Sequence, residues 1–466
     1  MRCLWSSVAL AAALAYLPTL SAQPVPQPKD GKLVIAAAVS PAAVPVPSLK
    51  YHLLPELRDQ HPGNQIQAFY KCSMEQHNFY HDKGEIEKRE KWSIAPLADL
   101  VGEKALIGYG GSGLRQADHA ARLESADWAI LIQFKAEGVN LLLPDVQQMR
   151  QLAGALKVRM RGEIARKEFD AAIRTAQTMF ALAASFNQHP TLIGQLVGIA
   201  IAHTTLGVVE EFARQPGAPN LFWALADLPT PFIDLRKGMQ GERLWVPKAY
   251  DAFRKADPIP ETELNRMVKE LTDWLGGGEG GKKVTPPSEW YSAQTGKPEA
   301  LIAAKDRLAK HGHKSADLEK LSKLQLAMMD DFATYELYRD ELMKWTSLPY
   351  WKLPADIAAA KPPAGIFPDL APAVVKVLQG RLRLQQYLSL LQSVEAVRAF
   401  AADNDGKLPD SLEATKLPVP VDPVTGKPFL YEVKEGVASI RGTPPIDRKA
   451  EPAFNREYGV TIRKSQ

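Results

Sequence analysis

Cysteine is almost absent from this chain of 466 residues, which contains only Cys3 and Cys72. If Cys3 belongs to a segment that is removed, a single thiol remains and no intramolecular disulfide can form. The fold must then be stabilised by its hydrophobic core. We therefore expect Cys72 to be buried, with an intermolecular disulfide as the alternative.

A strong charge of either sign is also lacking. The formal net charge is +4, with 24% charged and 45% hydrophobic residues. This is the composition of an ordinary soluble globular protein, and its mild basic excess is spread over the chain. We therefore expect neither nucleic acid nor an anionic membrane as a partner.

A coherent catalytic or cofactor motif is lacking as well. Residues 108–113 read GYGGSG and match the pattern GxGxxG before a predicted helix. A dinucleotide site also needs a clear strand in front and a run of βαβ units behind, and neither is found. We interpret this stretch as a flexible loop with a helix start, and we expect no cofactor.

The first 22 residues have the order of a secretory signal peptide. Arg2 gives a short positive region, residues 4–17 are apolar, and small residues end at Ala22, where we expect cleavage. The protein is therefore predicted to be exported to the periplasm or the exterior, and retention as an uncleaved anchor is the alternative. Residues 23–48 are rich in Pro and Ala and are predicted to form an extended arm.

Residues 49–372 are predicted to form a helical body around the most apolar stretch, residues 191–212. Apolar residues lie on every side of this helix, so it must be buried in protein or in lipid. Its length and the pair Gly194 and Gly198 suit a membrane span, whereas polar residues within it such as His203 do not. We interpret it as a central core helix, and no transmembrane span is expected once the signal peptide is cleaved.

A helical hairpin is predicted just before the central helix, from residues 146–165 and 168–186. The short join forces the two helices antiparallel. The spacing resembles a tetratricopeptide-type hairpin, although the glycine usual at the turn is Lys167 here. We therefore expect a repeat-like hairpin and not an array of repeats.

The first helix of that hairpin carries a run of basic residues interleaved with Glu163 and Glu168. We interpret the run as a solvated helix face and not as a nucleic-acid groove. Its members are Lys157, Arg159, Arg161, Arg166 and Lys167.

The C-terminal part is predicted to differ from the body. Residues 373–442 are expected to form a long helix and a β-hairpin that turns at residues 435–436, and residues 443–466 a loose tail. Within the body, the glycine-rich residues 276–283 are expected to form a flexible loop. The predicted fold class is mainly α: stacked antiparallel helices, with a repeat-like hairpin around a buried central helix, and a small C-terminal β-hairpin module.

Two resemblances add to this interpretation. GKLPDSL at residues 406–412 and PVDPVTGKPFLY at 420–431 are similar to the region after the long helix in major type II secretion pseudopilins. More widely, LKYHLLPEL at 49–57, ARLESADW at 121–128 and VPVDPVTGKPFLY at 419–431 resemble a family of uncharacterised exported proteins of planctomycete bacteria. The first resemblance implies an assembly element, and the second implies export but no particular activity.

His77 and His81 are the candidate metal site. They lie four residues apart on a helix predicted over residues 64–81, so both rings could face one metal ion. Zinc would accept this half-site but needs further ligands, and Cys72 lies far around the helix from both rings.

Three functional hypotheses follow. We favour an exported, non-enzymatic protein that binds another protein or an envelope component, because stacked helices commonly offer a groove and no catalytic set is found. The alternatives are a periplasmic metal-dependent hydrolase built on the histidine pair and a pseudopilin-like assembly element.

Overall fold

The computed structural model describes residues 31–463, apart from 139–140, 245–247, 277–284, 355–361, 369–371, 446–447 and 450. The predicted signal peptide (1–22), the start of the predicted arm and all but the first residue of the predicted flexible loop (276–283) lie outside the described residues.

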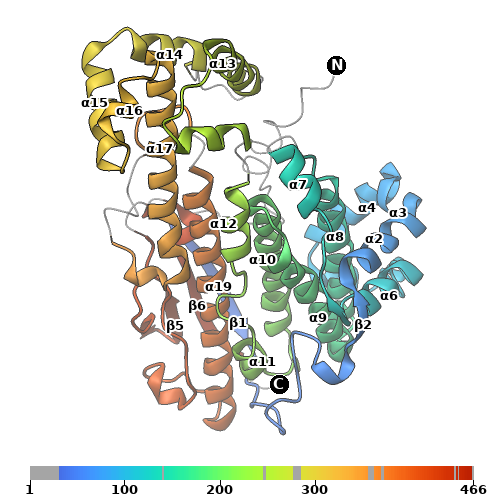
Figure 1. Cartoon of the computed structure of the whole chain (residues 1–466). Coiled ribbons are helices and arrows are strands. Elements are labelled where there is room, and N and C mark those ends of the chain that lie inside the picture. The colour runs from blue at the N-terminus through green and yellow to red at the C-terminus, as the bar shows by residue number, and fades with distance from the viewer. Residues whose placement is uncertain are drawn as a thin grey trace.

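The fold is mainly α, as the sequence predicts, and three stacked helices form its centre (Figure 1). These are α8 (Pro144–Ala165), α9 (Phe169–Ser185) and α10 (Leu192–Ala213), and each packs against the other two. The connections between them are short, so neighbouring helices run antiparallel. The predicted helical hairpin before the central helix is confirmed.

The predicted central helix is α10. Its N-cap is Thr191, whose hydroxyl accepts a hydrogen bond from the Gly194 amide at 3.1 Å. A Cβ added at Gly194 would lie 2.1 Å from His189, and one at Gly198 would lie 2.7 Å from Phe186. The two glycines thus permit close packing inside the protein. Among the described helices, α10 is the one long and apolar enough to cross a membrane, and 72% of its apolar window is buried in the protein.

The turn between α8 and α9 is a Schellman motif. The amide of Glu168 donates to the carbonyl of Glu163 at 2.9 Å, and that of Lys167 to Ile164 at 2.9 Å. Lys167 takes the left-handed position with φ of 61°. The turn that usually needs glycine is therefore built with lysine.

Short helices and a two-stranded parallel sheet cover one side of the central stack. The helix predicted over residues 64–81 is interrupted at Gln76, whose φ and ψ of −127° and 50° are not helical. The elements are β2 (His61–Asn64), α2 (Gln65–Glu75), α3 (His77–His81), α4 (Lys83–Ile94), α5 (Leu97–Leu100), α6 (Gly111–Ala120), β3 (Leu123–Ser125) and α7 (Leu131–Glu137).

After α10, two short helices return the chain to a separate group of helices, which projects at the upper left of Figure 1. The two short helices are α11 (Phe222–Ala226) and α12 (Arg236–Glu242). The separate group consists of α13 (Glu261–Gly276), α14 (Pro287–Thr295), α15 (Pro298–Lys310), α16 (Ser315–Leu318) and α17 (Lys323–Lys344). Short 3-10 helices are η1 (Leu57–Asp59), η2 (Lys104–Leu106), η4 (Phe186–Gln188), η5 (Lys248–Arg254), η6 (Trp345–Ser347), η7 (Tyr350–Lys352), η9 (Glu413–Thr415) and η11 (Pro452–Phe454).

The long helix α19 (Pro372–Asp403) then leads to a four-stranded sheet with the order β1-β6-β5-β4. The predicted hairpin is confirmed as β4 (Leu430–Lys434) and β5 (Val437–Arg441), joined through Glu435 and Gly436 at positive φ.

Two predictions about the chain ends are wrong. The arm expected over residues 23–48 contains β1 (Leu33–Val39), and the tail expected to be loose over 443–466 contains β6 (Arg456–Ile462). The two strands pair in parallel over seven residues, and β6 also pairs with β5. Each strand alone is short, and only the sheet that both ends complete satisfies their backbone groups.

Buried apolar residues form two cores. The first core joins β1, the N-terminal helices, α8–α12, α19 and the sheet, and the second core joins η5 and α13–α17 with Ile366 and Phe367. The predicted division into a body over 49–372 and a C-terminal module over 373–442 does not follow these cores, because the second core lies inside the body and the module shares the first core.

Candidate functional site

An open hollow of about 610 Å³ lies on the surface where α2 gives way to α3. The chain changes direction at Gln76, so six consecutive residues face the hollow, and the turn before α6 forms the opposite wall. The lining residues are Met74, Glu75, Gln76, His77, Asn78, Phe79, Gly110 and Gly111.

The glycine turn on the opposite wall starts α6, as interpreted from the sequence. Gly110 has φ of 76°, and a Cβ there would lie 2.3 Å from the Leu114 side chain. The Gln76 amide, in the orientation that satisfies both its atoms, donates to the Gly110 carbonyl and accepts from the Gly113 amide at 3.1 Å. The first turn of α6 is thus capped by Gln76, which occupies the position where a phosphate would bind in a dinucleotide site.

His77 and His81 both lie on α3 with exposed side chains, and their ring centroids are 4.4 Å apart. The break at Gln76 leaves their spacing unchanged, so the structure brings the pair together as the sequence predicts. Within the described ranges, however, no three His, Cys, Asp or Glu side chains are grouped so that they could hold a metal ion. Metal binding by this pair stays a prediction.

The floor of the hollow is held by Arg89 of α4. Its guanidinium donates to the Phe79 carbonyl and to the Tyr109 hydroxyl, the latter at 3.3 Å. It also lies 4.7 Å from the centroid of the Phe79 ring, in cation–π geometry. One buried side chain therefore fixes both walls of the hollow.

Cys72 lies on α2 behind this floor and is buried, as predicted. Burial raises the pKa of its thiol to about 12. The thiolate that a nucleophile or a metal ligand requires is therefore not formed near neutral pH.

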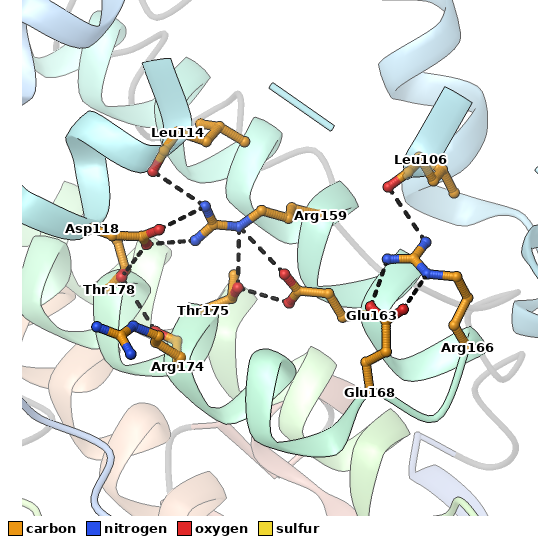
Figure 2. Close-up of polar contacts among 10 residues, drawn as sticks. All are labelled: Leu106, Leu114, Asp118, Arg159, Glu163, Arg166, Glu168, Arg174, Thr175 and Thr178. Atoms are coloured by element: carbon orange, nitrogen blue, oxygen red, sulfur yellow. Dashed lines mark hydrogen bonds and ion pairs between the residues drawn. The ribbon is translucent and has the colours of Figure 1, made fainter. Parts of the chain in front are cut away.

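A polar network joins α6 to α8 and α9 (Figure 2). Arg159 of α8 forms a two-point ion pair with Asp118, with nitrogen–oxygen distances of 2.6 and 3.0 Å. It also donates to the Leu114 carbonyl and to Thr175. Thr178 adds a hydrogen bond to Asp118 at 2.7 Å. The helix below the hollow is thereby fixed to the central stack.

Glu163 ends this network. It accepts a hydrogen bond from Thr175 at 2.7 Å and lies 3.7 Å from Arg159. Burial raises its pKa to about 7 despite the nearby arginine. Such a carboxyl group could exchange protons near neutral pH, but its recorded partners are side chains that join α8 to α9, and it lines no part of the hollow.

The solvated face predicted for the basic residues of α8 is wrong for Lys157, Arg159 and Arg161. Lys157 and Arg161 are fully buried, because α4 and α5 cover this side of α8. Arg161 pairs with Glu211 of α10 at 2.7 Å and donates to the carbonyls of Trp92 and Ala95.

Two residues that sequence reasoning missed organise the C-terminal sheet. Asp422, within the segment similar to pseudopilins, accepts hydrogen bonds from the amides of Val424 and Thr443 and from Gln386 of α19. Asp-Pro followed by Thr-Gly was a sufficient signal for a turn of this kind. Arg398 pairs with Glu395 and donates to the carbonyls of Ser40 and Ala218, and no local signal indicates these partners.

None of the protein-family models, curated proteins or solved structures compared with the chain matches it. The argument for a function therefore rests on the geometry of the hollow and of the network that supports it.

Proposed function

We propose that this is an exported, non-enzymatic protein that binds a segment of another protein or of an envelope component in the hollow between α2–α3 and α6. Export rests on the signal-peptide order of residues 1–22 and on the resemblance to exported planctomycete proteins. Binding rests on the hollow itself.

The observation that carries the proposal is the contrast between the wall and the floor. The Met74 side chain on the wall is 76% exposed, whereas Arg89 beneath it is buried and bonded to both walls. An exposed, flexible methionine over a fixed floor suits the binding of an apolar side chain. Glu75 and Asn78 beside it supply polar groups for specificity.

Photo-crosslinking in cells tests this proposal. A crosslinking amino acid at Asn78, in the hollow, is expected to give one dominant adduct. The same amino acid at Ile302 on α15 of the second core, which is 62% exposed, is the matched control and should give none. Met74→Asp should remove the adduct at position 78. Equal adducts at both positions, or an adduct that Met74→Asp leaves unchanged, would contradict the proposal.

A metal-dependent hydrolase is the second candidate, and the closeness of the His77 and His81 rings favours it. Zinc titration of the purified protein by calorimetry tests the metal. One equivalent bound by the wild type, and none by His77→Ala/His81→Ala, would support this candidate. A wild type that binds no zinc would end it.

A further inference from the structure

Solvent reaches α10 along one line only. Seven of its residues are partly exposed, and the other residues of the helix are buried. The spacing between the seven alternates between three and four residues, which places them on a single face. They are Ile193, Leu196, Ala200, His203, Gly207, Glu210 and Arg214.

This line faces α19, beside which α10 runs in parallel (Figure 1). A Cβ added at Gly380 of α19 would lie 3.8 Å from Leu196, and the His203 ring lies 5.8 Å from that of Tyr387, seven residues further along each helix. A Cβ at Gly207 would likewise meet its nearest atom, the Tyr387 hydroxyl, at 3.9 Å. A methyl group at either glycine would clash with nothing, so there is room along the line.

Positive charge gathers at the C-terminal half of the line. Glu210 accepts hydrogen bonds from Tyr387 at 2.9 Å, from Arg456 of β6 at 3.1 Å and from Tyr458. It is also ion-paired with Arg214. One carboxylate is thus shared by two arginines.

Arg383 of α19 adds a further positive charge without an acceptor. Among the described residues, it forms no hydrogen bond and no ion pair, and its guanidinium lies 5.9 Å from the Phe454 ring. The carboxylate whose charge acts on it is Glu451, which is already ion-paired with Arg448. A partly buried guanidinium with no acceptor calls for a ligand or water.

His203 is the second group with an unused nitrogen, because its buried Nε2 has no hydrogen-bond partner. Burial lowers the pKa of His203 well below 6.5, and the charges of Arg383 and Arg456 lower it further. The surroundings of His203 are therefore those of a cationic site in which no anion is bound.

We propose that the line along α10 binds an amphipathic anion, with a carboxylate at Arg383 and Arg456 and an apolar chain over Ala200, Leu196 and Ile193. Guanidinium groups match the planar geometry of a carboxylate. From His203 to Ile193 the helix rises about 15 Å, enough for a chain of about eight carbons. The site lies apart from the hollow and goes beyond the function proposed above.

Calorimetry of the full chain with octanoate tests this proposal. Saturable binding is expected, at least tenfold tighter than binding of octanol, acetate or phosphate at equal concentration. Arg383→Gln should weaken octanoate binding at least tenfold, and Gly380→Ala should weaken it by narrowing the line. Because Arg383 forms no hydrogen bond with the described residues, its replacement should leave the fold intact. A thermal melt of each variant checks this.

Arg266→Gln is the matched control, since Arg266 is an exposed arginine on α13 of the second core. It should bind octanoate as the wild type does. Proton NMR of His203 gives a second readout, because a bound carboxylate should raise the pKa of its ring. The proposal is overturned if octanoate does not bind saturably, if Arg383→Gln binds it equally well, or if octanol or acetate binds as tightly.

Discussion

The two cores are stabilised by polar groups in different places. In the first core, ion pairs are fully buried: Arg161 and Glu211 have side chains that are 0% and 2% exposed, and Arg398 and Glu395 are 0% and 1% exposed. In the second core, the ion pairs lie at the surface, as between Arg266 and Glu263.

The difference follows the path of the chain. The second core forms from helices that follow one another, whereas the first core joins β1 at one end of the chain to α19 and β6 at the other. Arg398 donates to the carbonyl of Ser40, and Arg161 to that of Trp92, so each buried arginine fixes a segment from a distant part of the sequence. Buried pairs add little stability overall but demand strict geometry. We infer that they set the arrangement of the first core.

Removal of β1 should give the largest effect on this comparison. Deleting residues 31–40 takes away the buried side chains of Ile35 and Val39 and exposes the edge of β6. We expect a loss of about 3–6 kcal/mol in the unfolding free energy of the first core, from about 1.5–3 kcal/mol for each large side chain. Hydrogen exchange resolved by peptide should show faster exchange in β5, β6 and α19 and unchanged exchange in α13–α17. Equal loss of protection in both cores would show that they are not independent.

Breaking a buried pair comes next. Arg161→Met leaves Glu211 buried without its partner and should cost about 3–5 kcal/mol, measured by urea unfolding. Arg161→Met with Glu211→Leu should recover most of this loss, because two apolar groups replace the pair. If the single change costs less than about 1 kcal/mol, the pair does not have the role assigned here.

The buried carboxylate of the second core should matter less. Asp331 accepts hydrogen bonds from the Tyr291 hydroxyl at 2.7 Å and from the amides of Ile366 and Phe367. In Asp331→Asn, the amide NH₂ would face some of these donors, so we expect a loss of about 1–3 kcal/mol. Exchange in α14 and α17 should rise while that in α10 stays unchanged.

The same residue gives the second core a pH dependence. Burial raises the pKa of Asp331 to about 7, so the folded core keeps a proton that the unfolded chain releases above about pH 4. The folded state then binds more protons than the unfolded state, and stability should fall as pH rises from about 4 to 7. In Asp331→Asn this slope should disappear. A slope that the variant retains would have to be assigned to another group.

The sequence predicted features whose signals are local. The all-apolar run of α10, the turn at Glu435 and Gly436 and the spacing of His77 and His81 each depend on neighbouring residues, and the structure contains all three. The pairing of β1 with β6 depends on residues at opposite ends of the chain. The burial of Arg161 depends on Glu211 and on carbonyls of another segment, and no helical periodicity contains that information.

The candidate hollow shows the same limit. The sequence indicated its glycine turn and its histidines separately, as a loop with a helix start and as a metal half-site. It did not indicate that Gln76 would leave the helix and cap α6, which brings the two together. A helix break that is stabilised by a distant partner has no signal of its own in the sequence.

The smallest expected effect compares one turn in each core. In the second core, α15 ends in the same Schellman motif as α8, with Gly312 at φ of 98° where α8 has Lys167 at 61°. A left-handed conformation costs a non-glycine residue about 1–2 kcal/mol, and glycine loses about 0.5–1 kcal/mol more backbone entropy on folding. Lys167→Gly should therefore stabilise the first core by about 0.5–1 kcal/mol, and Gly312→Lys should destabilise the second by a similar amount.

Urea midpoints of the two variants check both signs. Lys167 and Gly312 occupy the same position of the same motif, so each variant serves as the control for the other. If Lys167→Gly destabilised the first core, the lysine side chain would have to contribute contacts that outweigh its backbone conformation. The turn between α8 and α9 would then depend on its charge and not only on its geometry.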